Sequence, residues 1–510
     1  MKKSFIKKLI ITITSVLIVS LAVGYFYIKS EIKHHQGVYT EQVDFSKFNV
    51  SQSSIAITNV NVLSQDCSEM KGSLTVLIKD GIILDVGKNI EITSAYKKID
   101  GSGKFLIPGL IDAHTHLHRS KNDLLLFLAN GVTSIANMNS KPDQLYLKWR
   151  KEANEGALSP RIYIAAGGMS SKKGFMAKMN TIFGSRYYNT EEEARQAIRE
   201  FKKLGYDAIK SYAPNREAYY AIMDEAQKQG IPVTGHLPLD VGLQEFYTSG
   251  QSALAHAEEI TKNTFEDFGG LNYIFYDRID EYMQYLEENA DKIAQNLKKN
   301  NITVCSTVRY IENIHKQATD LPKFLKEIEL EYANPGIVEG SHFAKGWLPG
   351  SNKFESPGST TENKNETADL YWSNYVKAIH IMTKALVDND VKLTSGADTN
   401  GFCTVSGFSL HDQLASLEEI GLTITQVLRT STITAAQWMQ HNTGVIEKGF
   451  AADLVLLDKN PLEDIDNTRT IQAVITNGKY LDRTTLDNML LAVKEANARS
   501  RNISINAYLN

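Results

Sequence analysis

The stretch FLIPGLIDAHTHLH, residues 105–118, joins an apolar run typical of a buried strand to three histidines at alternate positions. His114 and His116 fall on one face of such a strand, because successive side chains of a strand point to opposite faces. Chance alone gives about 0.3 H-x-H pairs in a chain of this histidine content, so one pair is a weak motif. The pair therefore gains meaning only from partners elsewhere in the chain. His118 lies beyond the strand, and we expect it to be a loop or supporting residue.

Composition places the chain among ordinary globular proteins. It has 510 residues, of which 42% are apolar and 22% charged, with a net charge of −4. This length suits one large domain with a smaller attachment, or several domains. The charge balance is not that of a polycationic protein, so we expect no nucleic acid partner. Cys67, Cys305 and Cys403 are odd in number and far apart, which excludes a disulfide framework and a cysteine-based zinc site.

The N-terminal segment, residues 1–30, differs from the rest of the chain. Four lysines in MKKSFIKK precede residues 9–28, which carry no charge and are long enough to span a bilayer. The lysine excess before the segment predicts an N-terminus inside the cell and the remaining chain outside the cytoplasm. Ser20 and Ala22 could form a cleavage site, but the apolar run continues to Ile28, which favours an uncleaved anchor in the cell membrane.

Two alternatives to an anchor remain open for this segment. Cleavage would make the protein secreted or periplasmic. A buried core helix is the third interpretation, but it would not need the flanking lysines. After the segment, residues 31–50 are polar and are predicted to be a tether.

Two separate parts of the chain are predicted to form one small β-sandwich domain. Residues 51–106 and 441–482 contain short alternating segments, with Asp80-Gly81 and Asn477-Gly478 as hairpin signals. The final residues, 483–510, are expected to be a helical tail.

The region between them, residues 107–440, alternates β-branched runs with amphipathic helical stretches such as 191–204 and 216–229. This rhythm is typical of an α/β fold with a parallel sheet, and eight strands close a (β/α)8 TIM barrel. The eight candidate strands are 105–114, 133–137, 161–167, 208–212, 232–236, 253–257, 302–307 and 392–398. Residues 348–367, rich in Ser, Thr and Asn, are predicted to be a surface loop, either an active-site lid or a disordered insertion.

Side chains with metal-binding chemistry fall at the carboxyl ends of these candidate strands, where such barrels place their active sites. The residues are His114, His116, Lys210, His236, His256 and Asp398. Steps of 26 residues from Lys210 to His236 and of 20 from His236 to His256 each fit one βα unit. We therefore expect consecutive strands to present these side chains to one site.

Four imidazoles and a carboxylate suit a divalent ion, zinc first and manganese or iron as alternatives. Such an ion lowers the pKa of water toward 7 and so supplies a hydroxide nucleophile. Lys210 does not fit as an ammonium, because burial and neighbouring cations both oppose its charge. A carbamate, formed from the neutral amine and carbon dioxide, could instead bridge two metals about 3.5–4 Å apart.

These segments together resemble the amidohydrolase superfamily, in particular its binuclear branch with a carboxylated lysine, which includes prolidase-like and imidazolonepropionase-like enzymes. The resemblance covers residues 54–482 and lies in PGLIDAHTHLH, IKSY, TGH, AHAEE, SGADT and GVIEKGFAADLVLLDKNPL. It implies one metal on His114 and His116, and a second on His236 and His256. It further implies Lys210 as the bridging carbamate, and Asp398 as both ligand and proton shuttle. Related deaminases usually carry H-x-x-E at strand 5, whereas this chain has Leu239 three residues after His236.

The expected function is hydrolysis of amide or cyclic amide C–N bonds, for example in dipeptides or N-acyl amino acids, by a membrane-anchored enzyme with a small-molecule substrate. Tyr212 could polarise the substrate carbonyl or merely pack, and Arg309 could bind a substrate carboxylate or form a surface ion pair. A lactonase or phosphotriesterase is one alternative. A non-catalytic, metal-retaining envelope binding protein is the other. A homo-oligomer is compatible with the sequence.

Overall fold

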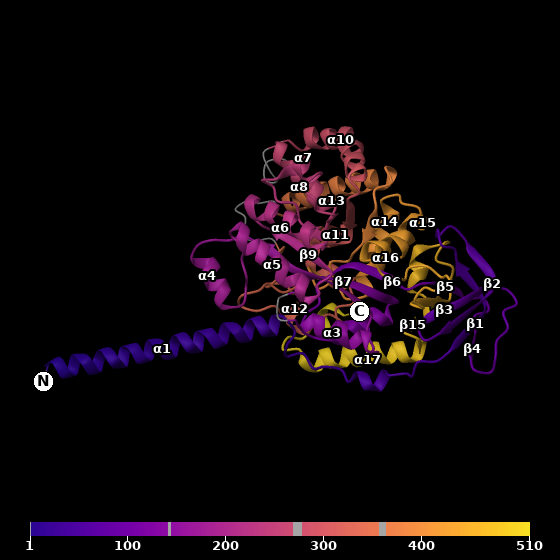
Figure 1. The fold of residues 1–510 in the computed structure, drawn as a ribbon. Helices are drawn as coiled ribbons and strands as arrows, with labels where there is room; N and C mark the ends of the chain where they lie inside the picture. Colours follow the sequence, from indigo (N-terminus) through magenta and orange to yellow (C-terminus); the bar gives the residue numbers. More distant parts are fainter. Residues whose placement is uncertain (1, 141–143, 269–277, 356–363, 510) are drawn as a thin grey trace.

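The structure is a computed structural model that describes residues 2–140, 144–268, 278–355 and 364–509. Two eight-stranded sheets form the centre of the described part of the chain. Figure 1 shows the barrel helices around one sheet, the second sheet at one side of the body, and helix α1 extending away from the body.

The first sheet is parallel, and its strand order follows the chain order. Its strands are β6 (Leu110–Thr115), β7 (Val132–Ser140), β8 (Arg161–Ser170), β9 (Ala208–Ala213), β10 (Val233–Gly235), β11 (Ala253–Leu254), β12 (Thr303–Ser306) and β13 (Leu393–Ser395). A parallel bridge between Thr115 and Thr399 brings its first and last strands together. The sheet is thus a nearly closed barrel, which confirms the predicted barrel class.

The prediction of one barrel strand at 105–114 is wrong in one respect, because the structure has two strands there. β5 (Phe105–Pro108) pairs with strands of the second sheet, and β6 begins the barrel. Gly109 lies between them, where a side chain would overlap Thr133. Proline and glycine break the strand here, so one apolar run contributes to both sheets.

The second sheet is mixed, and its order is β16-β15-β14-β5-β1-β2-β3, with β4 also paired to β1. Its other strands are β1 (Ile55–Leu63), β2 (Met70–Lys79), β3 (Ile82–Gly87), β4 (Lys97–Asp100), β14 (Leu454–Leu457), β15 (Ile471–Thr476) and β16 (Lys479–Asp482). Asp80-Gly81 and Asn477-Gly478 form the two predicted hairpin turns, each with positive φ at both residues. Hydrogen bonds join all eight strands into one sheet around its own apolar core, rather than the two separate layers of the expected sandwich.

Helices cover the outside of the barrel. Their bounds are α2 (Asn122–Ala129), α3 (Leu145–Asn154), α4 (Phe175–Ile182), α5 (Glu191–Leu204), α6 (Arg216–Gln229), α7 (Gly242–Phe246), α8 (Glu258–Phe265), α10 (Ile279–Lys299), α11 (Val308–Phe324), α12 (Pro335–Glu339), α13 (Lys364–Asp388), α14 (Phe408–Glu419), α15 (Ile424–Thr430), α16 (Ile433–Met439) and α17 (Arg483–Ser500). The two helices predicted at 191–204 and 216–229 are confirmed as α5 and α6. Thr190 and Glu193 form a capping box at the start of α5, and Gly205 ends the helix in the left-handed conformation.

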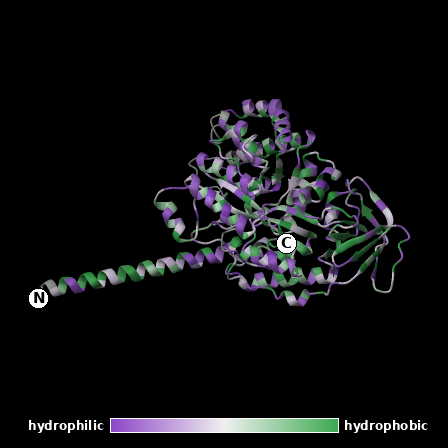
Figure 2. Cartoon of the chain, in the orientation of Figure 1, coloured by the Kyte–Doolittle hydropathy of each residue, from purple (hydrophilic) through white to green (hydrophobic). Residues whose placement is uncertain are grey.

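Helix α1 (Lys2–His35) has the length and apolar composition needed to cross a membrane. Its large apolar side chains are exposed, and Figure 2 shows that the mostly hydrophobic part of this helix lies outside the body. The helix continues into the segment predicted as a tether. Beyond it, the backbone N–H of Val43 donates to Asn122 Oδ1 at 2.9 Å, so this segment is attached to the body.

The predicted loop at 348–367 is ordered where the structure describes it. Leu348 and Asn352 are buried, and Asn352 donates a hydrogen bond to Gln317. Helix α13 begins at Lys364, so the predicted loop is too long at its end. Residues 356–363 lie outside the described residues.

Gly235 tests how tightly the barrel strands approach each other. Its φ is 130°, and a Cβ there would overlap the backbone of Ser211 on β9. Gly235→Ala should therefore lower the free energy of unfolding by about 2–4 kcal/mol. Gly230→Ala is the matched control, because its φ is also positive but its Cβ would meet no atom within 4 Å. Denaturant unfolding in detergent measures both, and equal losses would contradict the close approach.

Candidate active site

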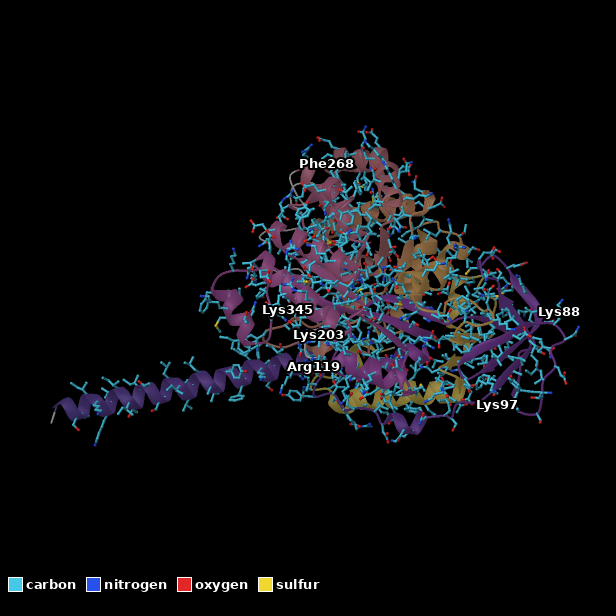
Figure 3. The ribbon with its side chains drawn as sticks, in the orientation of Figure 1. Lys88, Lys97, Arg119, Lys203, Phe268 and Lys345 are labelled. Atoms are coloured by element: carbon cyan, nitrogen blue, oxygen red, sulfur yellow. The ribbon has the colours of Figure 1, made fainter. Side chains whose placement is uncertain are left out.

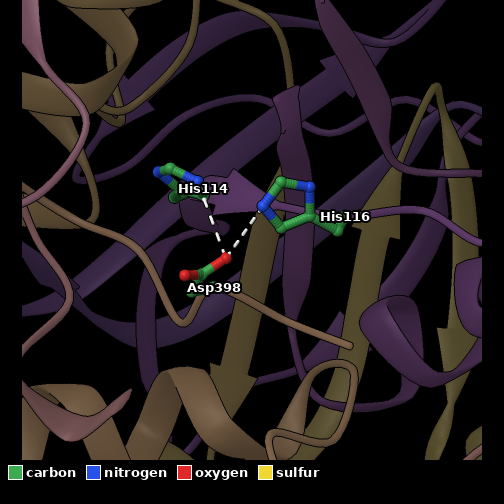
Figure 4. Close-up of side chains that lie close together, drawn as sticks. All are labelled: His114, His116 and Asp398. Atoms are coloured by element: carbon green, nitrogen blue, oxygen red, sulfur yellow. Dashed lines mark ion pairs between the residues drawn. The ribbon is translucent and has the colours of Figure 1, made fainter. Parts of the chain in front are cut away.

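Three of the predicted residues form a compact cluster at the barrel's carboxyl end. His114 lies on β6, His116 follows that strand, and Asp398 follows β13. One ligand atom from each lies within 4.8 Å of the others. Asp398 Oδ1 is 2.9 Å from His116 Nε2 and 3.6 Å from His114 Nε2, as Figure 4 shows. His114 and Asp398 are buried, whereas the side chain of His116 is 26% exposed. The cluster thus has one open side.

Asp398 occupies a backbone conformation that few residues adopt. Its φ is 49°, in the left-handed region that aspartate tolerates better than most side chains. Its carbonyl oxygen accepts hydrogen bonds from Gly401 N at 3.0 Å and Thr404 Oγ1 at 2.9 Å. This turn holds the carboxylate against the two histidines.

Lys210 on β9 is buried beside the cluster. Its Nζ lies 3.1 Å from His114 Nε2. Burial lowers the pKa of Lys210 to about 8, because an apolar surrounding disfavours the ammonium. With such a pKa, about a tenth of the amine is neutral at pH 7, far more than for an ordinary lysine.

His236 and His256 extend the cluster across the next two strands. They follow β10 and β11, and their ring centroids are 5.0 Å apart. The His256 ring is also 4.5 Å from that of His114. The structure therefore brings together all six side chains that the sequence predicted for this site.

Three buried groups hold the histidine rings from behind. His114 Nδ1 lies 3.1 Å from the carbonyl oxygen of Ala255, and His256 Nδ1 lies 2.8 Å from Thr307 Oγ1. His236 Nδ1 is 3.0 Å from Glu259 Oε1, whose other oxygen accepts from the backbone N–H of Leu237. With Nδ1 engaged in each ring, Nε2 is the atom left to bind a ligand. Sequence reasoning missed Thr307 and Glu259, although Glu259 stands in the quoted AHAEE segment.

The donor set fits a divalent metal ion. Burial lowers the pKa of both His114 and His256 well below the usual value, so both rings are neutral, as metal ligands must be. Imidazole nitrogens and a carboxylate oxygen are the ligands that zinc and related ions take.

Other residues considered at the sequence level lie around the cluster. The ring of Tyr212 is 4.6 Å from that of His236, and the residue is 53% exposed. Arg309 Nη1 lies 3.6 Å from Glu312 Oε2, which is the ion pair that was one of its two expected roles. His118 faces the ring of His35 at the end of α1. Leu239 is exposed, and the carboxylate beside His236 comes from Glu259 instead.

A parallel α/β barrel with a histidine and aspartate cluster at its carboxyl strand ends defines a class of barrel hydrolases suited to a divalent metal. The amidohydrolase family model matches residues 105–333 and 345–481. The chain belongs to the amidohydrolase family, whose members typically bind divalent metals, and it is a hydrolase that acts on carbon–nitrogen bonds.

Similar proteins agree with this family. A 5'-deoxyadenosine deaminase from Methanosphaera stadtmanae is 23% identical over 87% of this chain and 96% of that protein. Among solved structures, bottromycin amidohydrolase has a TM-score of 0.67 and 20% identity, covering 91% of this chain and 96% of the other. A Xaa-Pro dipeptidase with bound methionine has a TM-score of 0.60 and 16% identity, covering 84% and 100%. At these identities the two structures establish the shared fold alone.

Glu259, which contacts Nδ1 of His236, provides a test of the metal site. Glu259→Gln removes the charge that holds His236, so we expect metal affinity to fall about 10–100-fold, the usual effect of losing such a partner. Titration with a metal-buffered zinc series measures it on the purified full-length protein. Glu217→Gln on exposed α6 surface is the matched control. Equal affinities for the two variants would remove Glu259 from the site.

Proposed function

We propose that this protein hydrolyses amide or cyclic amide bonds at the cluster, with N-acyl amino acids and dipeptides as the candidate substrates. The observation that carries the proposal is the contact chain from Asp398 through His114 to Lys210 and His256. It lies at the barrel end where such enzymes place catalysis. A panel of N-acyl amino acids, dipeptides and lactones tests it, since turnover of lactones alone would favour an esterase instead.

Two divalent ions fit the available donors. His114 and His116 would hold one, His236 and His256 the second, with Asp398 as a further ligand and a modified Lys210 between them. Zinc is the first candidate and manganese or iron are alternatives. When bound, such ions lower the pKa of water and polarise a carbonyl.

Lys210 supplies the bridging group as a carbamate. The neutral amine nitrogen bonds to the carbon of carbon dioxide, and one proton leaves the nitrogen. The product is an anion with two oxygens, which suits a buried position beside metal-binding histidines far better than an ammonium does. Burial of Lys210 against His114 supports this step, because burial favours the neutral amine.

Asp398 handles the proton during hydrolysis. Its carboxylate takes a proton from the attacking water and gives it to the leaving nitrogen, which departs as an amine. Tyr212, at the exposed edge beside His236, is placed to donate a hydrogen bond to the substrate carbonyl.

Deamination suits this site less well, although some relatives carry that name. Leu239 stands where an acidic residue would follow His236, and it has no proton to exchange. Glu259 does not replace it, because its side chain is 3% exposed and both carboxylate oxygens are engaged.

The same proposal includes membrane attachment. Residues 9–28 of α1 carry no charge, none of them is buried, and lysines stand on both sides. We propose that α1 is retained as a single anchor and that the body lies outside the cytoplasm.

Asp398→Asn should lower kcat by about 10²–10⁴-fold, because it removes the group that carries the proton. Asp390→Asn is the matched control, since Asp390 is 84% exposed just before β13. Steady-state kinetics on the best substrate of the panel compares them. Unchanged turnover in Asp398→Asn would exclude this role.

Lys210→Ala should lose both bound metal and activity, and added formate, acetate or bicarbonate should restore part of each. A free carboxylate can occupy the cavity and take the place of the carbamate. Lys210→Arg should show no rescue, because it keeps a positive charge. Metal analysis and kinetics measure the effect. Both are done with and without about 50 mM of the carboxylic acid, a large excess over the enzyme. Lys210→Ala with full metal content and activity would contradict the bridge.

A further inference from the structure

Helix α1 joins the body at the same barrel end that holds the candidate active site. The backbone N–H of Arg119 donates to Gln36 O at 2.8 Å, and the rings of His35 and His118 meet edge to face with their centroids 6.0 Å apart. His118 and Arg119 lie two and three residues after His116 of the cluster. Helix α4, which follows the carboxyl end of β8, lies along the same side of the body in Figure 1.

The contacts between α1 and the body begin at the end of its apolar segment. Residues 9–28 extend for about 30 Å as a helix, which equals the hydrocarbon thickness of a bilayer. Tyr25 and Tyr27 lie in the last turn of this segment. The ring of Tyr25 stacks on Phe183 at 5.6 Å, and that of Tyr27 is 6.3 Å from Phe343. An embedded α1 therefore places Phe183 and Phe343 at the membrane interface.

The surface around these contacts has the composition of a membrane-binding surface. Phe175 is 75% exposed, Met176 60%, Ile182 58% and Phe343 54%. Exposed lysines stand among them at 172, 173, 178 and 345. Aromatic side chains beside lysines are typical of protein surfaces that enter the headgroup region of an anionic bilayer.

A groove begins at this surface and runs along α1. Its volume is about 670 Å³, and it lies between the second half of α1, the end of α4 and Arg119. Ile32, Ile182 and Phe183 contribute apolar walls, while Lys29, Lys33 and Arg119 contribute positive charge. Arg119 follows His116 by three residues, and Figure 3 labels it beside the end of α1. The groove thus has apolar walls at the end of the apolar segment of α1, and one of its cations, Arg119, belongs to the loop that begins at His116.

We propose that the catalytic end of the barrel faces the bilayer and that this groove admits a long-chain N-acyl amino acid from the membrane. The acyl chain lies along the apolar walls and the carboxylate pairs with the groove cations, which brings the amide bond toward the cluster. This inference rests on the proposed amide hydrolysis and on α1 as an anchor, and it names the substrate class of that site.

Membrane depth tests the orientation independently of activity. Phe175→Cys in the full-length protein is labelled with an environment-sensitive fluorophore, which the buried Cys67, Cys305 and Cys403 do not take up. The protein is reconstituted into phosphatidylethanolamine and phosphatidylglycerol vesicles that contain a shallow spin-labelled lipid. We expect about twofold quenching at position 175. Leu84→Cys on β3, at the other end of the body in Figure 1, is the control and should not be quenched.

Matched N-palmitoyl and N-acetyl amino acids test the substrate class. With vesicle-borne substrate we expect kcat/KM to be at least about 10²-fold higher for the palmitoyl compound, because its chain is bound as well. Phe175→Asp should lower that value about tenfold and leave N-acetyl hydrolysis unchanged, because Phe175 is exposed and does not line the groove. Leu84→Asp is the control for the added charge.

The outcomes separate the proposals. No quenching at position 175 in a chain that resists carbonate extraction overturns the orientation while the anchor stands. Release of the chain by carbonate overturns the anchor, and the orientation with it. Equal kcat/KM for the palmitoyl and acetyl compounds overturns the substrate class while amide hydrolysis stands. Hydrolysis of neither compound overturns the substrate class, and the dipeptides of the panel then decide whether amide hydrolysis stands, while quenching still decides the orientation.

Discussion

The carboxylate of Asp112 is the interaction on which the active site depends. One of its oxygens accepts hydrogen bonds from the backbone N–H groups of Ala397 and His114, at 3.0 and 3.1 Å. The other accepts from Thr399 Oγ1 at 3.0 Å. The carboxylate is buried, and burial raises its pKa to about 7. The charged form therefore depends on these hydrogen-bond donors, which take the place of water. Through them the first strand of the barrel is joined to the loop after the last, and His114 meets Asp398.

Contacts from loops also position the site elsewhere in the barrel, because two short strands end just before histidines of the cluster. β10 has three residues and β11 two, so His236 and His256 lie in the loops that follow them. Side-chain contacts, rather than the hydrogen bonds between paired strands, hold such loops in place. Glu259 and Thr307 provide these contacts, and at Gly396 a side chain would overlap His114 and Cys305. A close-packed shell therefore fixes the site, as preorganised sites require.

The apolar N-terminal helix and the site are related by geometry. A helix anchored by twenty apolar residues has one end at the interface, and the contacts at Tyr25 and His35 attach that end to the catalytic face of the barrel. In the proposed anchored arrangement the site lies near the lipid headgroups, where amphiphilic molecules are concentrated and water-soluble ones are not. In that arrangement, position would favour amphiphilic molecules among the substrates that the cluster could hydrolyse.

The sequence by itself determined the barrel class, the helices at 191–204 and 216–229, both hairpins and the six clustered side chains, because each depends on local periodicity, on turn residues or on the βα rhythm. Tertiary structure alone decided that residues 105–114 serve two sheets, and which of Glu258 and Glu259 holds His236. Adjacent carboxylates look alike in sequence, and only packing makes one 3% exposed. The placement of α1 beside the catalytic end likewise depends on contacts between residues far apart in the chain, which no local pattern encodes.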